Sequence, residues 1–124
     1  MKIVLHAPED LELKSFDEPG MDIEARDPEA HYGATQMFAA SLALCTGSVL
    51  VAYADQAGAH VTDLAIRVKW HYADKPFRIG AIDMAIRWPS LPETRLDAAR
   101  RAASHCTLHH TLEQIPELTT TIGR

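Results

Sequence analysis

The stretch Tyr32–Gly58, YGATQMFAASLALCTGSVLVAYADQAG, decides the fold, because no charged residue occurs between Tyr32 and Ala54. Thr35 is a typical helix N-cap and Gly58 a typical C-terminal stop, so the pattern predicts a buried helix of about twenty residues. Hydropathy alone would also allow a transmembrane segment. We reject that interpretation, because small and weakly polar residues fill the stretch and no Lys or Arg anchors flank it. We therefore expect no membrane partner.

This helix is apolar nearly all round, so most of its sides must be covered. The chain has 124 residues, and a single sheet in a chain of that length can hardly cover all of them. A second copy of the chain is the simplest cover for the remaining face. The sequence therefore predicts a homodimer.

The segments that follow the helix predict a β-hairpin. Apolar and polar residues alternate from Val61 to Tyr72 and again from Ile82 to Trp88, with the turn signal Asp74-Lys75-Pro76 between them. Ile79 is out of phase with Ile82, and Gly80 beside it indicates a bulge. The residues expected on the buried face of the first strand are Leu64, Ile66, Val68, Trp70 and Tyr72.

The remaining segments complete the predicted fold. Ser90-Leu91-Pro92-Glu93 has the form of a capping box, so we expect a helix to begin there, a second helical segment to end at Pro116, and a short strand at 117–122. Short strands are also expected in residues 1–30, around Leu11 and Leu13 and around Ile23 and Ala25. The expected fold is α+β in one domain, 1–124, with an antiparallel sheet packed on the long central helix and helices near the C-terminus.

Composition narrows the possible partners and the compartment. The hydrophobic fraction is 47% and the charged fraction 23%, which is typical of a globular domain. Twelve Lys and Arg against seventeen Asp and Glu give a net charge of −5, with the basic residues scattered, so we expect no nucleic-acid partner. The apolar run after Met1 is too short for a signal peptide, so we expect a cytoplasmic protein.

The two cysteines and a histidine cluster are the candidates for chemistry. Cys45 lies in the middle of the predicted helix, where the simplest alternative is a small buried hydrophobe. Cys106 lies near the junction of the two C-terminal helical segments, where free backbone N–H groups could stabilise a thiolate. Cys106 with His109 and His110, and Cys45 as a further ligand, would form a metal site, although the spacing matches no zinc template well.

Two segments carry a resemblance to a known family. The helix reads Met37-Phe38-Ala39-Ala40-Ser41-Leu42-Ala43-Leu44-Cys45-Thr46, and after the hairpin Ala102-Ala103-Ser104-His105-Cys106-Thr107 opens the last helix. This arrangement resembles the OsmC/Ohr family of osmotically induced and organic hydroperoxide resistance proteins, over roughly residues 30–124, with a shortened N-terminal region 1–30. The resemblance implies an α+β intertwined homodimer with two sites at its interface. It also implies a cofactor-free thiol peroxidase of the antioxidant stress response.

The resemblance also implies roles for the cysteines. Cys45 would be the thiolate that attacks a small organic hydroperoxide, and Cys106 would resolve the resulting sulfenic acid as a disulfide. A dithiol would then reduce that disulfide. Neither a cofactor nor a metal is expected.

The sequence departs from the family pattern before the central helix. Active members carry an Asn-Pro-Glu type segment there, whose Glu orients an activating Arg, whereas this chain reads Gly33-Ala34-Thr35-Gln36. Arg26 is the only arginine before the helix and is the candidate for the activating group, with His31, Glu24 and Glu29 as alternatives. The candidate substrate-binding residues are Thr35, Gln36, Phe38 and Leu42.

The missing carboxylate predicts weak activity. It also leaves a second interpretation open, in which the chain keeps the fold and the dimer but binds a small apolar ligand or a partner without turnover. The Cys/His metal-binding module is the third interpretation.

Overall fold

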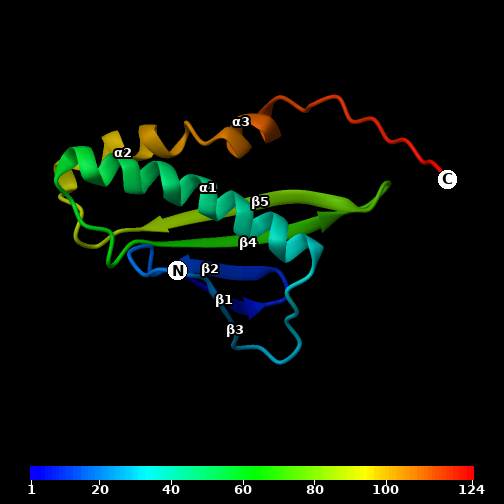
Figure 1. The fold of residues 1–124 in the computed structure, drawn as a ribbon, viewed down its shortest axis with the longest axis horizontal. Coiled ribbons are helices and arrows are strands. Elements are labelled where there is room, and N and C mark those ends of the chain that lie inside the picture. Colours follow the sequence, from blue (N-terminus) through cyan, green and yellow to red (C-terminus); the bar gives the residue numbers. More distant parts are fainter.

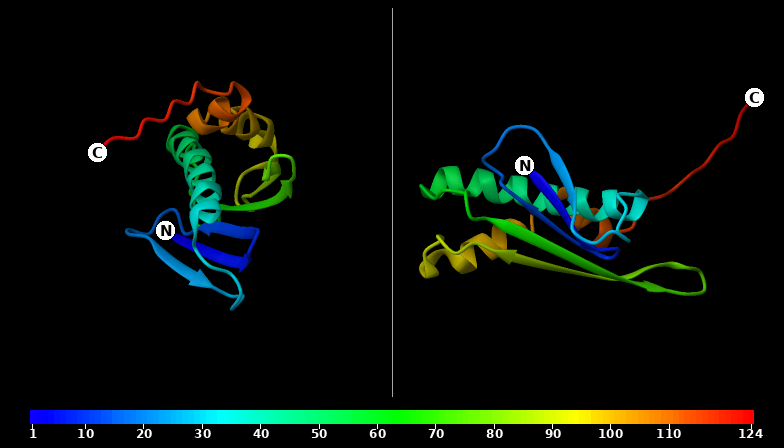
Figure 2. Two further views of the ribbon diagram at one scale, coloured as in Figure 1. Left: turned by 90° about the vertical axis from the view of Figure 1, so that its right-hand side faces the viewer. Right: turned by 90° about the horizontal axis from the view of Figure 1, so that it is seen from below.

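A computed structural model describes all residues, 1–124, and has three layers (Figures 1 and 2). A five-stranded sheet in the order β3-β1-β2-β4-β5 forms the first layer. The long helix α1 lies on it and contacts β2 and β4, and the helices α2 and α3 pack on α1. The elements are β1 Lys2–Ala7, β2 Asp10–Lys14, β3 Asp22–Ala25, α1 Ala34–Ala57, β4 Ala65–Ala73, β5 Arg78–Arg87, a 3₁₀ turn Glu93–Arg95, α2 Leu96–Ala103 and α3 Thr107–Glu113. The α+β class is confirmed.

The hairpin β4–β5 forms as the alternation predicts. Ile66, Val68 and Trp70 are buried on the helix side of β4. His71 pairs with Ala81 and Tyr72 pairs with Ile79, so Gly80 is the extra residue of a bulge. A Cβ at Gly80 would lie 2.7 Å from the Cβ of Ala73, which is why a residue without a side chain stands there.

The N-terminal strands make the sheet mixed, which corrects the prediction of a purely antiparallel sheet. β1 pairs antiparallel with β2 but parallel with β3. After β2 the chain loops back past the start of β1, where the Met1 ammonium donates hydrogen bonds to the carbonyls of Glu18 and Gly20. β3 therefore enters beside β1 in the same direction. The sequence pattern does not indicate β1 itself, because its buried residues Ile3, Val4 and Leu5 are consecutive and show no alternation.

The core lies between the sheet and one side of α1. Small residues of α1, among them Ala39, Ala43 and Ala54, allow the helix to approach buried strand residues such as Trp70. Gly47 packs against the ring of Phe16 so closely that a Cβ there would overlap the ring. The segment after β2 therefore holds α1 from a second direction.

The predicted C-terminal end of α1 is confirmed, whereas the predicted N-cap is wrong. Gly58 ends the helix in the left-handed conformation, with φ 70°, as predicted. The N-cap is Gly33 instead of Thr35. The Gln36 side chain takes the capping role, because its Oε1 accepts a hydrogen bond from the Gly33 N–H at 2.9 Å and its Nε2 donates to the Pro8 carbonyl at 2.8 Å.

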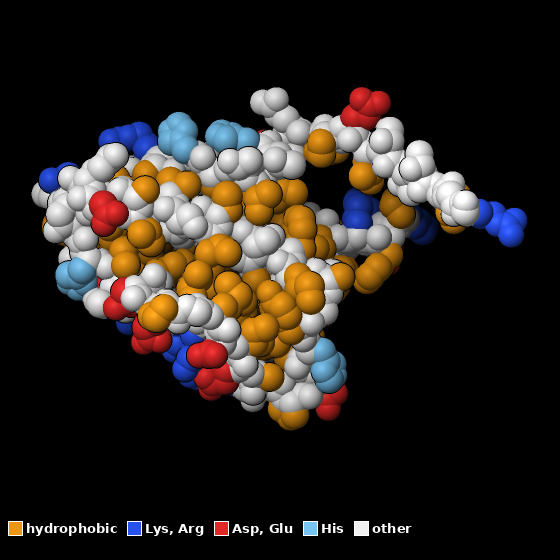
Figure 3. Space-filling view, viewed as in Figure 1, with side chains coloured by type: hydrophobic (Ala, Val, Ile, Leu, Met, Phe, Trp, Pro, Cys, Tyr) orange, Lys and Arg blue, Asp and Glu red, His pale blue; other side chains and the backbone are white.

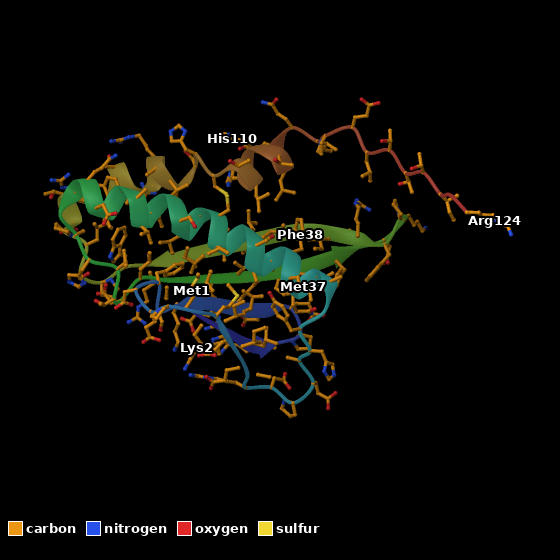
Figure 4. The ribbon with its side chains drawn as sticks, in the orientation of Figure 1. Met1, Lys2, Met37, Phe38, His110 and Arg124 are labelled. Carbon is orange, nitrogen blue, oxygen red and sulfur yellow. The ribbon has the colours of Figure 1, made fainter.

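Two predictions for the C-terminal third are wrong. Ser90 caps no helix, because its backbone N–H and its hydroxyl both donate to the Asp63 carboxylate, each at 2.7 Å. Residues 117–122 form no strand, since no neighbouring strand pairs with them. The chain beyond α3 instead extends away from the body to Arg124 (Figures 1 and 4).

By length and composition α1 could cross a membrane, and 44% of its most apolar window is buried inside the protein. The buried core helix of a soluble protein meets the same criteria. The absence of a membrane partner therefore stays a prediction.

Candidate functional site

The fold brings the two cysteines together from distant parts of the sequence. Cys45 lies in the middle of α1 and is half-buried, whereas Cys106 is the N-cap residue of α3 and is fully buried. Because α3 packs across α1, the two thiols lie close enough to influence each other's ionisation. Both sulfurs are reduced in this structure.

The two thiols differ in acidity. Burial raises the pKa of Cys45, and the hydrogen bond to Cys106 raises it further. Burial also acts to raise the pKa of Cys106, but the hydrogen bond from Cys45, the His109 N–H and the Thr46 hydroxyl outweigh it, so the pKa of Cys106 lies below its usual value. The surroundings therefore favour a thiolate on Cys106 over one on Cys45.

Backbone N–H groups at the start of α3 explain much of this difference. The first N–H groups of a helix have no partner within the helix. Those of Leu108 and His109 favour a thiolate on Cys106, and those of Thr107 and Leu108 act in the same sense, more weakly, on Cys45. The sequence-based expectation of a helix start beside Cys106 is confirmed.

Thr46 is a site residue that the sequence analysis missed. It is 2% exposed, and its hydroxyl oxygen has no hydrogen-bond partner of conventional geometry. It lies near Cys106 and is among the groups that lower the pKa of that thiol. A buried hydroxyl without a partner costs about 1–3 kcal/mol, so its position calls for an explanation. The only signal in the sequence was a polar residue next to Cys45 within an apolar helix.

A cavity of about 530 Å³ lies beside the cysteine pair, between β5 and the helices. Most of its wall is apolar and comes from β5 and from Leu42 of α1. Thr46, Ser104 and His109 bring polar groups to it. Arg100 and Glu113 add one charge of each sign to the lining. The arrangement suits a largely apolar small molecule with a polar end near Thr46, Ser104 or His109.

The structure gathers only part of the predicted substrate-binding set. Leu42 lines the cavity, whereas Thr35, Gln36 and Phe38 do not. Thr35 accepts a hydrogen bond from the Tyr72 hydroxyl at 3.2 Å, and the Gln36 amide is occupied at the helix start. Phe38 lies on the open side of α1 and is 40% exposed (Figure 4).

Arg26 is not near the cysteine pair within one protomer. It directly follows β3, the edge strand farthest from α3 (Figure 1), and its Nε lies 3.5 Å from Oε1 of Glu24. Its predicted activating role would therefore require a second copy of the chain.

The side chains of the α3 histidines lie beside Glu113. His109 Nε2 and His110 Nδ1 lie 3.3 and 3.7 Å from Oε1 of Glu113, in partly exposed positions. No three His, Cys, Asp or Glu side chains gather in a geometry that could hold a metal ion. The metal-binding interpretation gains no support from this arrangement.

Comparisons with known proteins agree with the fold. Residues 27–121 match the family model described as OsmC-like protein. A crystal structure from Psychrobacter arcticus, named as an osmotic stress induced and detoxification response protein, is similar with a TM-score of 0.58 and 16% identity, covering 88% of this chain and 84% of that one. At that identity the likeness concerns the fold alone. No curated protein gives a significant match.

Proposed function

Because this chain belongs to the OsmC-like protein family, we propose that it is a thiol-dependent peroxidase that reduces small organic hydroperoxides through Cys45 and Cys106. Family membership supports an OsmC-like role in the response to stress. The observation that carries the proposal is that the fold brings the two thiols close together at the start of α3. The proposed site of action is the cytoplasm.

The proposed reaction has two steps at sulfur. The Cys45 thiolate attacks the distal oxygen of the hydroperoxide; the S–O bond forms, the O–O bond breaks, and the alkoxide takes a proton and leaves as the alcohol. The Cys45 sulfenic acid then condenses with the Cys106 thiol, which forms the disulfide and releases water. A dithiol returns the enzyme to its reduced form by thiol–disulfide exchange and becomes a disulfide itself.

Exposure supports this assignment of roles. Cys45 is half-buried and lies on the side of α1 that reaches the surface, whereas Cys106 is fully buried. A peroxide therefore meets Cys45 first. The cavity supports an organic substrate, because its apolar β5 wall can bind a hydrocarbon group.

A homodimer is part of the proposal, because one side of α1 is uncovered. Exposed or half-buried residues recur along this side at helical spacing, and hydrophobic side chains gather on the same face of the molecule (Figure 3). We call this side the open stripe; its residues are Met37, Phe38, Ser41, Cys45, Ser48 and Ala52. A second copy would bury this uncharged surface and enclose Cys45.

The extended tail after α3 supports an intertwined dimer. Ile115, Leu118 and Ile122 are 88, 89 and 98% exposed, which is a large apolar surface for a short segment. The Thr-rich segment around them has high strand propensity but no strand to pair with in its own protomer. We propose that a second copy of the chain covers these apolar side chains in an intertwined dimer.

The reaction is tested by counting free thiols and measuring the intact mass of the reduced protein, before and after one equivalent of an organic hydroperoxide, under a denaturing quench. Rapid loss of both thiols with a mass decrease of two hydrogen atoms is the expected result. Two unreacted thiols after several minutes would contradict the proposal.

The dimer is tested by light scattering over a range of concentrations. We expect the mass of a dimer for the unmodified protein. We expect the mass of a monomer for Phe38→Asp, because this variant places a charge in the open stripe. A measured mass equal to that of one chain, at every concentration of the unmodified protein, would contradict the dimer and the intertwined tail.

The cavity favours a second candidate function, a binding protein for a small apolar ligand without turnover. Its wall is mostly apolar, and neither sulfur is among its lining residues. A hydrophobic alcohol that raises the melting temperature, in a protein whose thiols stay reduced in the presence of the hydroperoxide, would favour this function over the first.

A further inference from the structure

The face of the sheet that points away from α1 has a groove of its own. Side chains alternate between the two faces of a strand, so the neighbours of the buried residues point away from the core. On β2, β4 and β5 such residues enclose a groove of about 340 Å³. On β5, Met84 and Ile86 line the apolar cavity, whereas Ala85 and Arg87 line this groove. The groove is therefore a separate site from the one beside the cysteines.

Three cations surround one small residue of this groove, Ala65. In the register of the sheet, Ala65 pairs with Lys14 of β2 on one side and with Arg87 of β5 on the other. Arg67 lies two residues further along β4 and lines the same groove. In a chain with a net charge of −5, this arrangement is a local concentration of positive charge.

The acidic residues that line the groove do not cancel this charge. Oε1 of Glu12 lies 3.0 Å from Nε2 of His6 on β1. Asp83 pairs in the register with Lys69, two residue pairs along the hairpin from Ala65. The end of the groove at Ala65 therefore keeps an excess of positive charge.

The Arg67 guanidinium is held in place and still has donors to offer. Its Nε and Nη2 donate hydrogen bonds to the Asp10 carboxylate at 2.7 and 2.8 Å. A guanidinium carries further N–H donors on Nη1, so the side of it that faces away from Asp10 stays free. Lys14 and Arg87 form no ion pair within the protein. One cation is therefore fixed in position beforehand, and two more are available to an anion.

We propose that the Ala65 end of this groove binds the phosphate group of a small phosphate monoester. The phosphate lies over the Ala65 methyl group, and Lys14, Arg67 and Arg87 donate hydrogen bonds to its oxygens. Near neutral pH such a group carries about 1.5 to 2 negative charges on its oxygens, which suits several cationic donors better than a carboxylate with a single charge. The organic part of the ligand lies over Ala85, the other small side chain of the groove.

Calorimetric titration at low ionic strength, with phenyl phosphate as the probe, tests the site. We expect saturable binding to the unmodified protein and binding weaker by about tenfold or more to Arg87→Ala, because a charged donor is lost. Arg95→Ala is the matched control, since Arg95 is exposed and without an ion pair but lies outside the groove. Cys45→Ser should also bind the probe unchanged, because the site does not involve the thiols. No saturable binding, or equal weakening in Arg87→Ala and Arg95→Ala, would overturn the proposal.

Nuclear magnetic resonance locates the probe, and related anions define the ligand class. We expect phenyl phosphate to move the amide signals of Ala65 and Ala85 and to leave those of Leu42 and Thr46, at the apolar cavity, in place. Benzoate and inorganic phosphate should each bind more weakly, since benzoate has less charge and inorganic phosphate has no organic part. Equal affinity for benzoate would overturn the recognition of phosphate, and equal affinity for inorganic phosphate would overturn the assignment of a monoester. Shifts at the cavity instead of the groove would overturn the site.

Discussion

Cys45 and Cys106 carry the same functional group, yet their surroundings move their pKa values in opposite directions. Cys45 lies in the interior of α1, and the backbone N–H groups that favour its thiolate come from Thr107 and Leu108 of α3. Cys106 stands at the beginning of a helix, where the N–H groups of Leu108 and His109 are free. Burial is the largest cause acting on both thiols; it prevails at Cys45, whereas at Cys106 the neighbouring Cys45, the backbone N–H groups of α3 and Thr46 together outweigh it.

The largest effect is expected when the more accessible sulfur is removed. Cys45→Ser should lower peroxide consumption on the order of 10³-fold or more, since the attacking atom is lost. The measurement is the initial rate of organic hydroperoxide loss with a dithiol in excess. A variant that keeps a substantial rate would show that Cys106 can attack by itself and would reverse the proposed roles.

Removal of the buried sulfur should have a different outcome. Cys106→Ser should permit a single oxidation and then stop, because Cys45 sulfenic acid has no thiol beside it. Intact mass should show the addition of one oxygen, or of more on overoxidation, and a sulfenic acid reagent should label Cys45. Sustained turnover equal to that of the unmodified protein would contradict the resolving role.

The pH dependence follows from the two opposite shifts. Because burial and the neighbouring Cys106 raise the pKa of Cys45, the attacking thiol, from 9.0, the rate of the first oxidation should rise through a midpoint above 9.0. In Cys106→Ser burial still raises the pKa of Cys45 but the contribution of Cys106 is lost, so the midpoint should move to lower pH. A thiolate held by the fold adds stability above its unfolded pKa that is lost as the pH falls through its folded pKa. Identical midpoints in both proteins would show that the two thiols do not share a charge.

A smaller effect is expected for the packing that holds α1 near the pair. Gly47→Ala would force a methyl group against the Phe16 ring and should cost about 1–3 kcal/mol in the free energy of unfolding. Gly123→Ala has open space around it and is the matched control. Urea denaturation measures both, and equal midpoints would show that Phe16 moves aside freely.

The smallest effect on stability is expected at Arg26. Its ion pair with Glu24 is solvent-exposed, so Arg26→Ala should change the free energy of unfolding by less than about 0.5 kcal/mol. The oxidation rate of Cys45 in the same variant tests the activating role. An unchanged rate would contradict the role that the family resemblance implies for this residue.

Local sequence signals predicted those elements whose determinants are local. The alternation from Leu64 to Tyr72 and the Gly58 stop depend on neighbouring residues and were read correctly. The predicted helix caps at Thr35 and Ser90 are wrong, because residues distant in sequence decide the local structure. Pro8 accepts a hydrogen bond from Gln36 at the start of α1, and Asp63 accepts one from Ser90. The pattern of 117–122 indicates a strand, but a strand also needs a neighbour, which one protomer does not offer.

The candidate site was predictable only in part. The resemblance to the family predicted that Cys45 and Cys106 lie together. Their spacing in the sequence could not predict it, because they belong to separate helices. That Leu42 would border a cavity and Phe38 would not depends on how α3 crosses α1. Thr46 escaped notice because a threonine in a helix ordinarily bonds to its own backbone, and only the three-dimensional arrangement shows that this one does not.

The interaction of a thiol in the middle of α1 with a thiol at the start of α3 has a further, entropic consequence. A disulfide between them would close a chain loop that contains the whole β4–β5 hairpin and α2. Restricting the unfolded chain to that loop would favour the folded state by about 4 kcal/mol. Oxidation would then leave a protein that melts at a higher temperature than its reduced form, so a thermal scan could report its redox state without any chemical label.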